Sequence, residues 1–153
     1  MKNLPYDHRQ STTNLVLAVM AITSVVAILA ALGDGLESAA GIIVFGAMMT
    51  AVVFVFSELR TTVDESNIIA TFRLGWPKRT VPISALSSSQ TVRNKWWYGF
   101  GVRLIPDGWM YNIWGLDAVE IRYDRGERHE TFRIGTNDPE GLAAAIAAAR
   151  QEF

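Results

Sequence analysis

The chain has 153 residues, half of them apolar, and its 14 Lys and Arg against 15 Asp and Glu leave a net charge of −1. A nearly neutral chain of this length indicates one small domain and is not typical of a protein that binds nucleic acid through its overall charge. The absence of cysteine excludes disulfides, thiolate metal sites and a cysteine nucleophile.

Two uncharged segments near the N-terminus predict a membrane-spanning helical hairpin. They cover residues 15–32 and 39–57, and as helices each would be about 27–29 Å long, close to the ~30 Å hydrocarbon core of a bilayer. Gly33, Asp34 and Gly35 favour a turn between them. The alternatives are two buried helices of a soluble protein, which normally show a polar face, and a cleaved signal peptide, whose apolar stretch is normally shorter.

Basic residues flank this hairpin and are absent from its connection. Lys2 and Arg9 precede the first segment, whereas the connection carries Asp34 and Glu37, and basic residues resume at Arg60. The positive-inside rule therefore predicts that both termini lie in the cytoplasm, in a multi-pass protein of the inner (cytoplasmic) membrane. Residues 1–14 are then a cytoplasmic tail.

Small residues recur four positions apart in both segments. Ala27 with Ala31, and Ala47 with Ala51, would allow two helix backbones to approach closely. We interpret this spacing as packing within the hairpin, with a dedicated dimer face as the alternative.

Residues 58–153 contain 24 charged residues, 12 of each sign, which is typical of a globular domain outside the membrane. Short β-rich runs separated by turn residues predict about seven strands in a barrel or sandwich. These runs are residues 61–64, 68–74, 79–83, 89–93, 102–105, 118–123 and 130–134.

One helix is predicted to close the chain. Asp138 can cap it and Pro139 suits the first helical position. An apolar stripe along it predicts that the helix covers an open end of the β domain, and comprises Leu142, Ile146, Ala149 and Phe153.

This order of segments resembles small, largely uncharacterised bacterial membrane proteins that carry a pleckstrin-homology-like (PH-like) domain after two membrane spans. The resemblance covers nearly the whole chain and rests on the spans, TVDESN, GWPKRTVPIS, VRNKWWYGFGVRL and DGWMYNIWGLDAVEI. It implies a bent, partly open β-barrel of about seven strands, closed by a C-terminal helix. Because PH-like folds bind lipids, peptides or proteins, the resemblance implies an architecture more than a ligand.

The first hairpin departs from the PH domains that bind phosphoinositides. Those domains typically carry several basic residues there, whereas this turn reads Glu65, Ser66 and Asn67. Their lipid-headgroup site is therefore not implied for this chain.

Charge and aromatic residues divide the domain unevenly. Residues 60–103 carry seven basic and two acidic residues, and residues 104–153 carry five basic and nine acidic residues. Basic and aromatic side chains together suit an anionic membrane surface or a protein partner, with core burial and a mixed solvated surface as the alternatives. The candidate surface comprises Lys78, Arg79, Arg93, Lys95, Trp96, Trp97 and Trp109. If Trp96 and Trp97 lay in a strand, they would point to opposite faces.

Catalytic patterns are weak. Neither histidine has a metal-binding or nucleophile-activating neighbourhood, and no phosphate-binding glycine loop or hydrolase motif occurs. We therefore expect no enzyme activity, no cofactor and no metal. The hypothesis is a non-enzymatic binding or scaffolding module at the cytoplasmic membrane face, with the bilayer and a protein as partners and no nucleic acid. The alternative is an accessory subunit of a larger membrane complex, held mainly through its spans.

Overall fold

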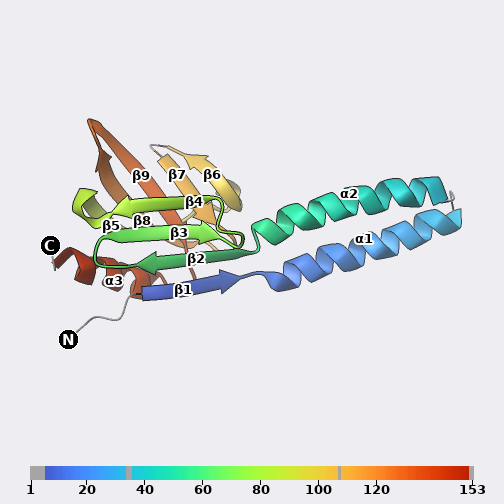
Figure 1. Ribbon diagram of the computed structural model, residues 1–153, viewed down its shortest axis with the longest axis horizontal. Coiled ribbons are helices and arrows are strands. Elements are labelled where there is room, and N and C mark those ends of the chain that lie inside the picture. The colour runs from blue at the N-terminus through green and yellow to red at the C-terminus, as the bar shows by residue number, and fades with distance from the viewer. Residues whose placement is uncertain (1–5, 34–35, 107, 152–153) are drawn as a thin grey trace.

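The computed structural model describes residues 6–33, 36–106 and 108–151. Two long helices extend from one end of a β domain, and a third helix lies at the opposite end (Figure 1). The elements are β1 (Tyr6–Ser11), α1 (Thr13–Gly33), α2 (Leu36–Val55), β2 (Glu58–Val63), β3 (Asn67–Phe72), β4 (Lys78–Pro82), β5 (Leu86–Arg93), β6 (Gly101–Ile105), β7 (Gly108–Asn112), β8 (Asp117–Arg125), β9 (Arg128–Gly135) and α3 (Pro139–Gln151). Short 3₁₀ turns lie at Ile83–Ala85 and Trp96–Tyr98.

The strands form two sheets. The first has the order β1-β2-β3-β4 and is antiparallel throughout, with Leu59 of β2 paired to Phe72 of β3. The second has the order β5-β8-β9-β7-β6, in which only the β7–β9 pair is parallel. The β8–β9 turn contains Gly126 at a φ of 64°, a conformation that glycine adopts without strain.

The described residues contain nine strands, two more than the seven predicted. The first addition is β1, which lies in the segment interpreted as a cytoplasmic tail. Its sequence YDHRQS has no apolar alternation, and it is ordered by pairing with β2. The second is β7, whose sequence GWMYN is short and starts with a glycine that sits against Thr131 of β9. Neither strand has a local pattern strong enough for a sequence-based prediction.

The N-terminal helices lie close to the predicted spans. Within the described residues, α1 is the one helix long and apolar enough to cross a bilayer, while the apolar part of α2, Ala39–Val55, is shorter. Only 11% of the apolar stretch of α1 is buried within the protein, whereas the core helix of a soluble protein is mostly buried. Asp34 and Gly35 of the predicted turn lie outside the described residues.

The two helices approach each other differently from the predicted alanine spacing. Ala27 is buried, but Ala47 and Ala51 are exposed. The close approach on α2 is instead at Gly46, where an added Cβ would lie 1.9 Å from Cγ2 of Thr23 on α1. Glycine allows this contact because it has no side chain.

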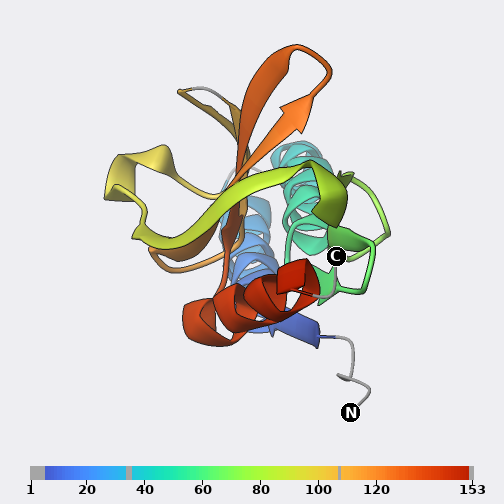
Figure 2. The same ribbon diagram turned by 90° about the vertical axis from the view of Figure 1, so that its left-hand side faces the viewer.

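The core lies between the two sheets and α3. The stripe of α3 is buried as predicted at Leu142, Ile146 and Ala149, and Phe153 lies outside the described residues. Asp138 caps the helix, because its Oδ1 accepts the backbone N–H of Gly141 at 3.0 Å. In the view of Figure 2, α3 crosses the near end of the domain with α1 and α2 behind it. The largest fully buried apolar side chains are Leu59, Ile68, Phe72, Val81, Met110, Val119, Ile121, Phe132, Ile134, Leu142 and Ile146.

Candidate functional site at the helix–sheet junction

The helix pair and the first sheet form one continuous unit. Thr12 alone separates β1 from α1, and only Phe56 and Ser57 separate α2 from β2. The β1–β2 pairing ends at Ser11 and Glu58, and the next bond is Thr12 N–H to the Ser57 carbonyl at 2.7 Å. Two adjacent, hydrogen-bonded connections therefore join the first sheet to the helices. In Figure 1, α1 and α2 continue in roughly the direction of β1 and β2.

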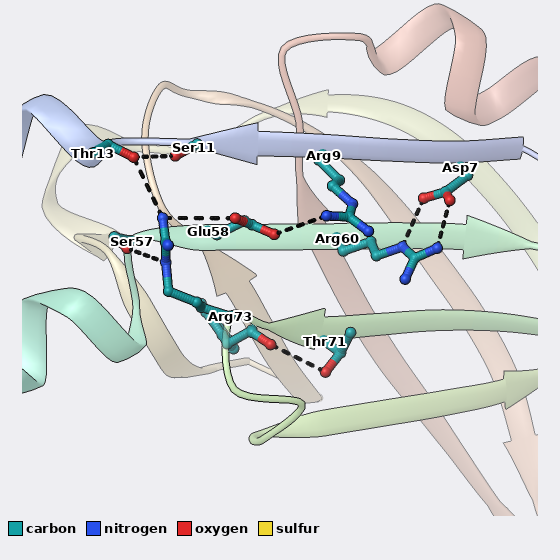
Figure 3. Close-up of polar contacts among 10 residues, drawn as sticks. Asp7, Arg9, Ser11, Thr13, Ser57, Glu58, Arg60, Thr71 and Arg73 are labelled. Atoms are coloured by element: carbon teal, nitrogen blue, oxygen red, sulfur yellow. Dashed lines mark hydrogen bonds and ion pairs between the residues drawn. The ribbon is translucent and has the colours of Figure 1, made fainter.

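Arg73 links both helices to the first sheet. It follows β3, whose C-terminal end lies beside the start of β2. Its Nε donates to Ser57 Oγ at 2.9 Å and its Nη2 donates to Thr13 Oγ1 at 3.4 Å (Figure 3). The guanidinium also lies 3.6 Å from Glu58 Oε2 and 4.7 Å from the ring centre of Phe54.

Charges at the junction do not cancel. Glu58 is shared between Arg73 and Arg9, whose Nη1 lies 3.8 Å from the other carboxylate oxygen. Asp7 accepts two hydrogen bonds from Arg60, at 2.8 and 2.6 Å, and this interaction holds the pKa of Asp7 below its usual range (Figure 3). Among these five groups, three guanidinium groups and two carboxylates leave one net positive charge.

Two apolar grooves flank the helix pair next to the junction. The first, of about 580 Å³, runs between α1 and α2, with Arg73 at the end nearest the first sheet. The second, of about 340 Å³, lies between the helix ends and the start of β6, and includes Phe100 and Arg103. Both grooves have much more apolar than polar lining.

Exposed aromatic and apolar side chains surround the helix ends. Leu74 and Trp76, in the turn after Arg73, are 63% and 72% exposed. Across the junction, Phe100 stacks on Trp114 with ring centres 5.5 Å apart. The Trp114 carbonyl accepts a hydrogen bond from Gln10 Nε2 on β1, which places this loop at the same end of the sheet. We call Leu74, Trp76, Phe100 and Trp114 the junction rim.

The structure places the candidate residues from the sequence on three parts of the β domain: β4, the end of β5 with the turn after it, and β7. Lys78 is exposed at the start of β4, two residues after Trp76, whereas Trp109 is 40% exposed beside the β6–β7 turn. Arg93, Lys95, Trp96 and Trp97 are exposed near the end of β5. The two tryptophans lie in a 3₁₀ turn rather than a strand, so both are exposed and their rings meet edge to face at 5.7 Å.

Arg79 bridges the two sheets. From β4, its guanidinium pairs with Glu130 of β9 and donates from Nε to the Tyr123 hydroxyl at 3.1 Å. The Tyr123 hydroxyl donates to Glu130 at 2.7 Å. Burial raises the pKa of Tyr123, which keeps this donor protonated. Arg79 is only 18% exposed, and its charge is used within the domain.

A buried carboxylate supports the loop that follows β5. Glu120 accepts from Arg133 Nε at 2.7 Å, and Arg133 Nη1 reaches Asn94 Oδ1 at 3.4 Å. The same guanidinium lies 5.8 Å from the Tyr98 ring centre. Burial acts to raise the pKa of Glu120, but Arg133, Gln90 and Arg122 outweigh it and hold that pKa below its usual value.

Sequence reasoning left Arg73 and the junction rim out of the candidate surface. The signal for Arg73 was weak, because a basic residue at a strand end is common on any solvated surface. The β2–β3 register places it against Thr13 and Ser57, which are distant from it in sequence. No cluster of three His, Asp or Glu side chains that could hold a metal occurs among the residues that the structure describes.

Comparisons of the chain with protein-family models, curated proteins and solved structures find no match. Function therefore has to follow from the geometry of the junction and its surroundings.

Proposed function

We propose that the chain is a small integral protein of the inner (cytoplasmic) membrane, with α1 and α2 both inserted and both termini in the cytoplasm. Its β domain acts as a non-enzymatic binding or scaffolding module at the cytoplasmic face. The sequence resemblance to PH-like membrane proteins supports this proposal, and so does a fold of two sheets closed by a C-terminal helix.

The observation that carries the proposal is the continuous β1–α1 and α2–β2 junction. Because the Thr12–Ser57 hydrogen bond extends the β1–β2 pairing, inserted helices would hold the first sheet upright on the bilayer. The junction rim would then meet the lipid headgroups, while the β8–β9 turn would point into the cytoplasm (Figure 1). Large amphipathic aromatic rings suit this interface.

The same junction favours a retained α1 over a cleaved signal peptide. Removal of α1 and the residues before it would remove β1 from the first sheet. It would also remove the Tyr6 hydroxyl from Asp138, a 3.1 Å hydrogen bond, and Asp7 from Arg60. A strand whose contacts reach α3 belongs to the folded domain.

Single-cysteine labelling tests the orientation directly, because the natural chain has no cysteine. We would introduce Leu74→Cys in the junction rim and, as a matched control, Glu127→Cys in the β8–β9 turn. Both are surface turn positions. The full chain, labelled with an environment-sensitive fluorophore, is reconstituted into phosphatidylcholine–phosphatidylglycerol vesicles that contain brominated lipid.

We expect quenching and a blue shift at position 74 and neither at position 127. In whole cells, both cysteines should react with a membrane-impermeant maleimide only after the inner membrane is opened. Equal quenching at the two positions would overturn the fixed orientation. Labelling of intact spheroplasts would overturn the cytoplasmic assignment.

The alternative is an accessory subunit of a larger membrane complex, favoured by large aliphatic side chains that α1 and α2 expose, such as Ile22, Leu29 and Val44. Cross-linking in native membranes distinguishes the two functions. Partners retained after residues 14–55 are replaced by an unrelated helical hairpin would favour the binding module. Partners lost with the natural hairpin would favour the subunit.

A further inference from the structure

We propose that the groove between α1 and α2 binds one acyl chain of an anionic phospholipid, whose phosphate interacts with Arg73. This inference rests on the proposed membrane insertion of the hairpin and names a ligand for its junction. It assigns a binding role to Arg73 in addition to its contacts within the chain.

The groove has the shape and lining that an acyl chain requires. Val16, Leu17 and Met20 form its α1 side, and Ala47, Ala51 and Phe54 form its α2 side. Its volume of about 580 Å³ lies within the usual ~300–1,000 Å³ range for small-molecule sites. The groove exists because the helices make their close approach at Gly46, and the exposed methyl groups of Ala47 and Ala51 leave space on the neighbouring face.

The positive charge of Arg73, at the end of the groove nearest the first sheet, favours an anion. Arg73 lines the groove, and among the residues that the structure describes no acidic side chain does. Arg73 does not have its charge fully neutralised, because it shares Glu58 with Arg9. In the described part of the chain, its hydrogen bonds use Nε and Nη2, which leaves Nη1 to donate to a phosphate oxygen.

Position along the helices also favours a lipid over a soluble ligand. Arg73 lies against Thr13, the first residue of α1, and Phe54, near the end of α2. If the helices span the bilayer, this is the level of the headgroups, and the apolar groove below it is at the level of the acyl chains. One ligand that combines a phosphate with a hydrocarbon chain fits both parts.

Native mass spectrometry of the purified full chain in mild detergent provides the test, with dioleoylphosphatidylglycerol and dioleoylphosphatidylcholine as probes. Arg73→Gln removes the charge but keeps a hydrogen-bonding group. Ala51→Phe fills the groove and leaves the charge of Arg73 in place. Arg128→Gln, an exposed arginine at the β8–β9 turn, is the matched control for loss of charge.

We expect the natural chain and Arg128→Gln to bind phosphatidylglycerol in preference to phosphatidylcholine. Arg73→Gln should reduce that preference by about tenfold, as the loss of a charge-assisted hydrogen bond predicts. Ala51→Phe should reduce binding of both lipids, and it supports or refutes the groove even if Arg73→Gln fails to fold.

Three results would each overturn the lipid site. They are an unchanged lipid preference in folded Arg73→Gln, unchanged lipid binding in Ala51→Phe, and a loss of preference in Arg128→Gln equal to that in Arg73→Gln. So would displacement of the lipid by glycerol phosphate alone, because a soluble anion cannot occupy the groove. Quenching at position 74 together with any of these results would leave the proposed function standing and remove only the lipid site. Absence of quenching would instead remove the proposed orientation.

Discussion

Substitution of Arg79 separates its role in the domain from the surface role that the sequence suggests. In Arg79→Gln, Glu130 and the Tyr123 hydroxyl lose a charged partner, and the guanidinium no longer packs 5.4 Å from the Phe132 ring centre. The matched control is Lys78→Gln, because Lys78 is the exposed preceding residue on the same strand. Both variants lose one positive charge, so a difference between them reports the contacts and not the net charge.

The burial of the pair sets the expected magnitude. The side chains of Arg79 and Glu130 are 18% and 24% exposed, so the pair is neither fully exposed nor fully buried. A surface ion pair contributes about 0.2–1 kcal/mol, and breaking a buried pair costs about 3–5 kcal/mol. We expect Arg79→Gln to lower the free energy of unfolding by about 2 kcal/mol. For a domain of this size, that corresponds to a fall in Tm of roughly 8–16 °C. Lys78→Gln should stay within about 0.5 kcal/mol of the natural chain.

Thermal unfolding of the full chain in detergent, followed by near-ultraviolet circular dichroism, measures this difference at several pH values. The hydrogen bond from Tyr123 lowers the pKa of Glu130, partial burial opposes it, and the charges of Arg79 and Arg125 lower that pKa further, below the ordinary value of 4.5. A lowered folded-state pKa contributes stability above the unfolded-state value, and the contribution is lost as the pH falls through the folded-state value. The gap between the natural chain and Arg79→Gln should therefore shrink below about pH 4.

Two results would refute this reasoning. The first is an unchanged Tm in Arg79→Gln, which would show that the bridge between the sheets contributes no stability. The second is a selective loss of binding to anionic vesicles in Arg79→Gln but not in Lys78→Gln. Arg79 would then act at the membrane surface, as the basic and aromatic sequence pattern suggests.

Two further substitutions test the second sheet. Glu120→Ala removes a 5% exposed carboxylate from Arg133 and Gln90. It should destabilise the domain by about 3 kcal/mol in the same unfolding assay. A loss below about 1 kcal/mol would show that the contacts of Glu120 with Arg133 and Gln90 are not needed for stability. Gly108→Ala would place a Cβ 1.6 Å from the Thr131 carbonyl oxygen, so β7 should separate from β9. The backbone amide hydrogens of β7 should then exchange at least tenfold faster, which corresponds to a loss of about 1.4 kcal/mol in local stability. Unchanged exchange at Met110 and Tyr111 would contradict the parallel pairing.

Local patterns in the sequence determined the elements whose side chains repeat regularly. The uncharged runs around Leu15 to Leu32 and after Ala39 predict two helices, and the stripe at Leu142, Ile146 and Ala149 predicts the buried face of α3. Short β-rich runs bounded by turn residues predict seven of the strands, and in β2 and β3 alternate residues are buried. These features depend on neighbours a few positions apart, so no tertiary information is needed.

Features that depend on contacts between residues distant in sequence are decided only by the tertiary structure. β1 is a strand because β2, about 50 residues later, supplies its hydrogen bonds, and nothing within YDHRQS indicates this. Arg79 and Arg73 look alike as basic residues at strand ends, yet one bridges the two sheets and the other joins β3 to both helices. Composition predicts that a basic side chain is present, but strand register decides which partner it meets, because register brings together groups from separate parts of the chain.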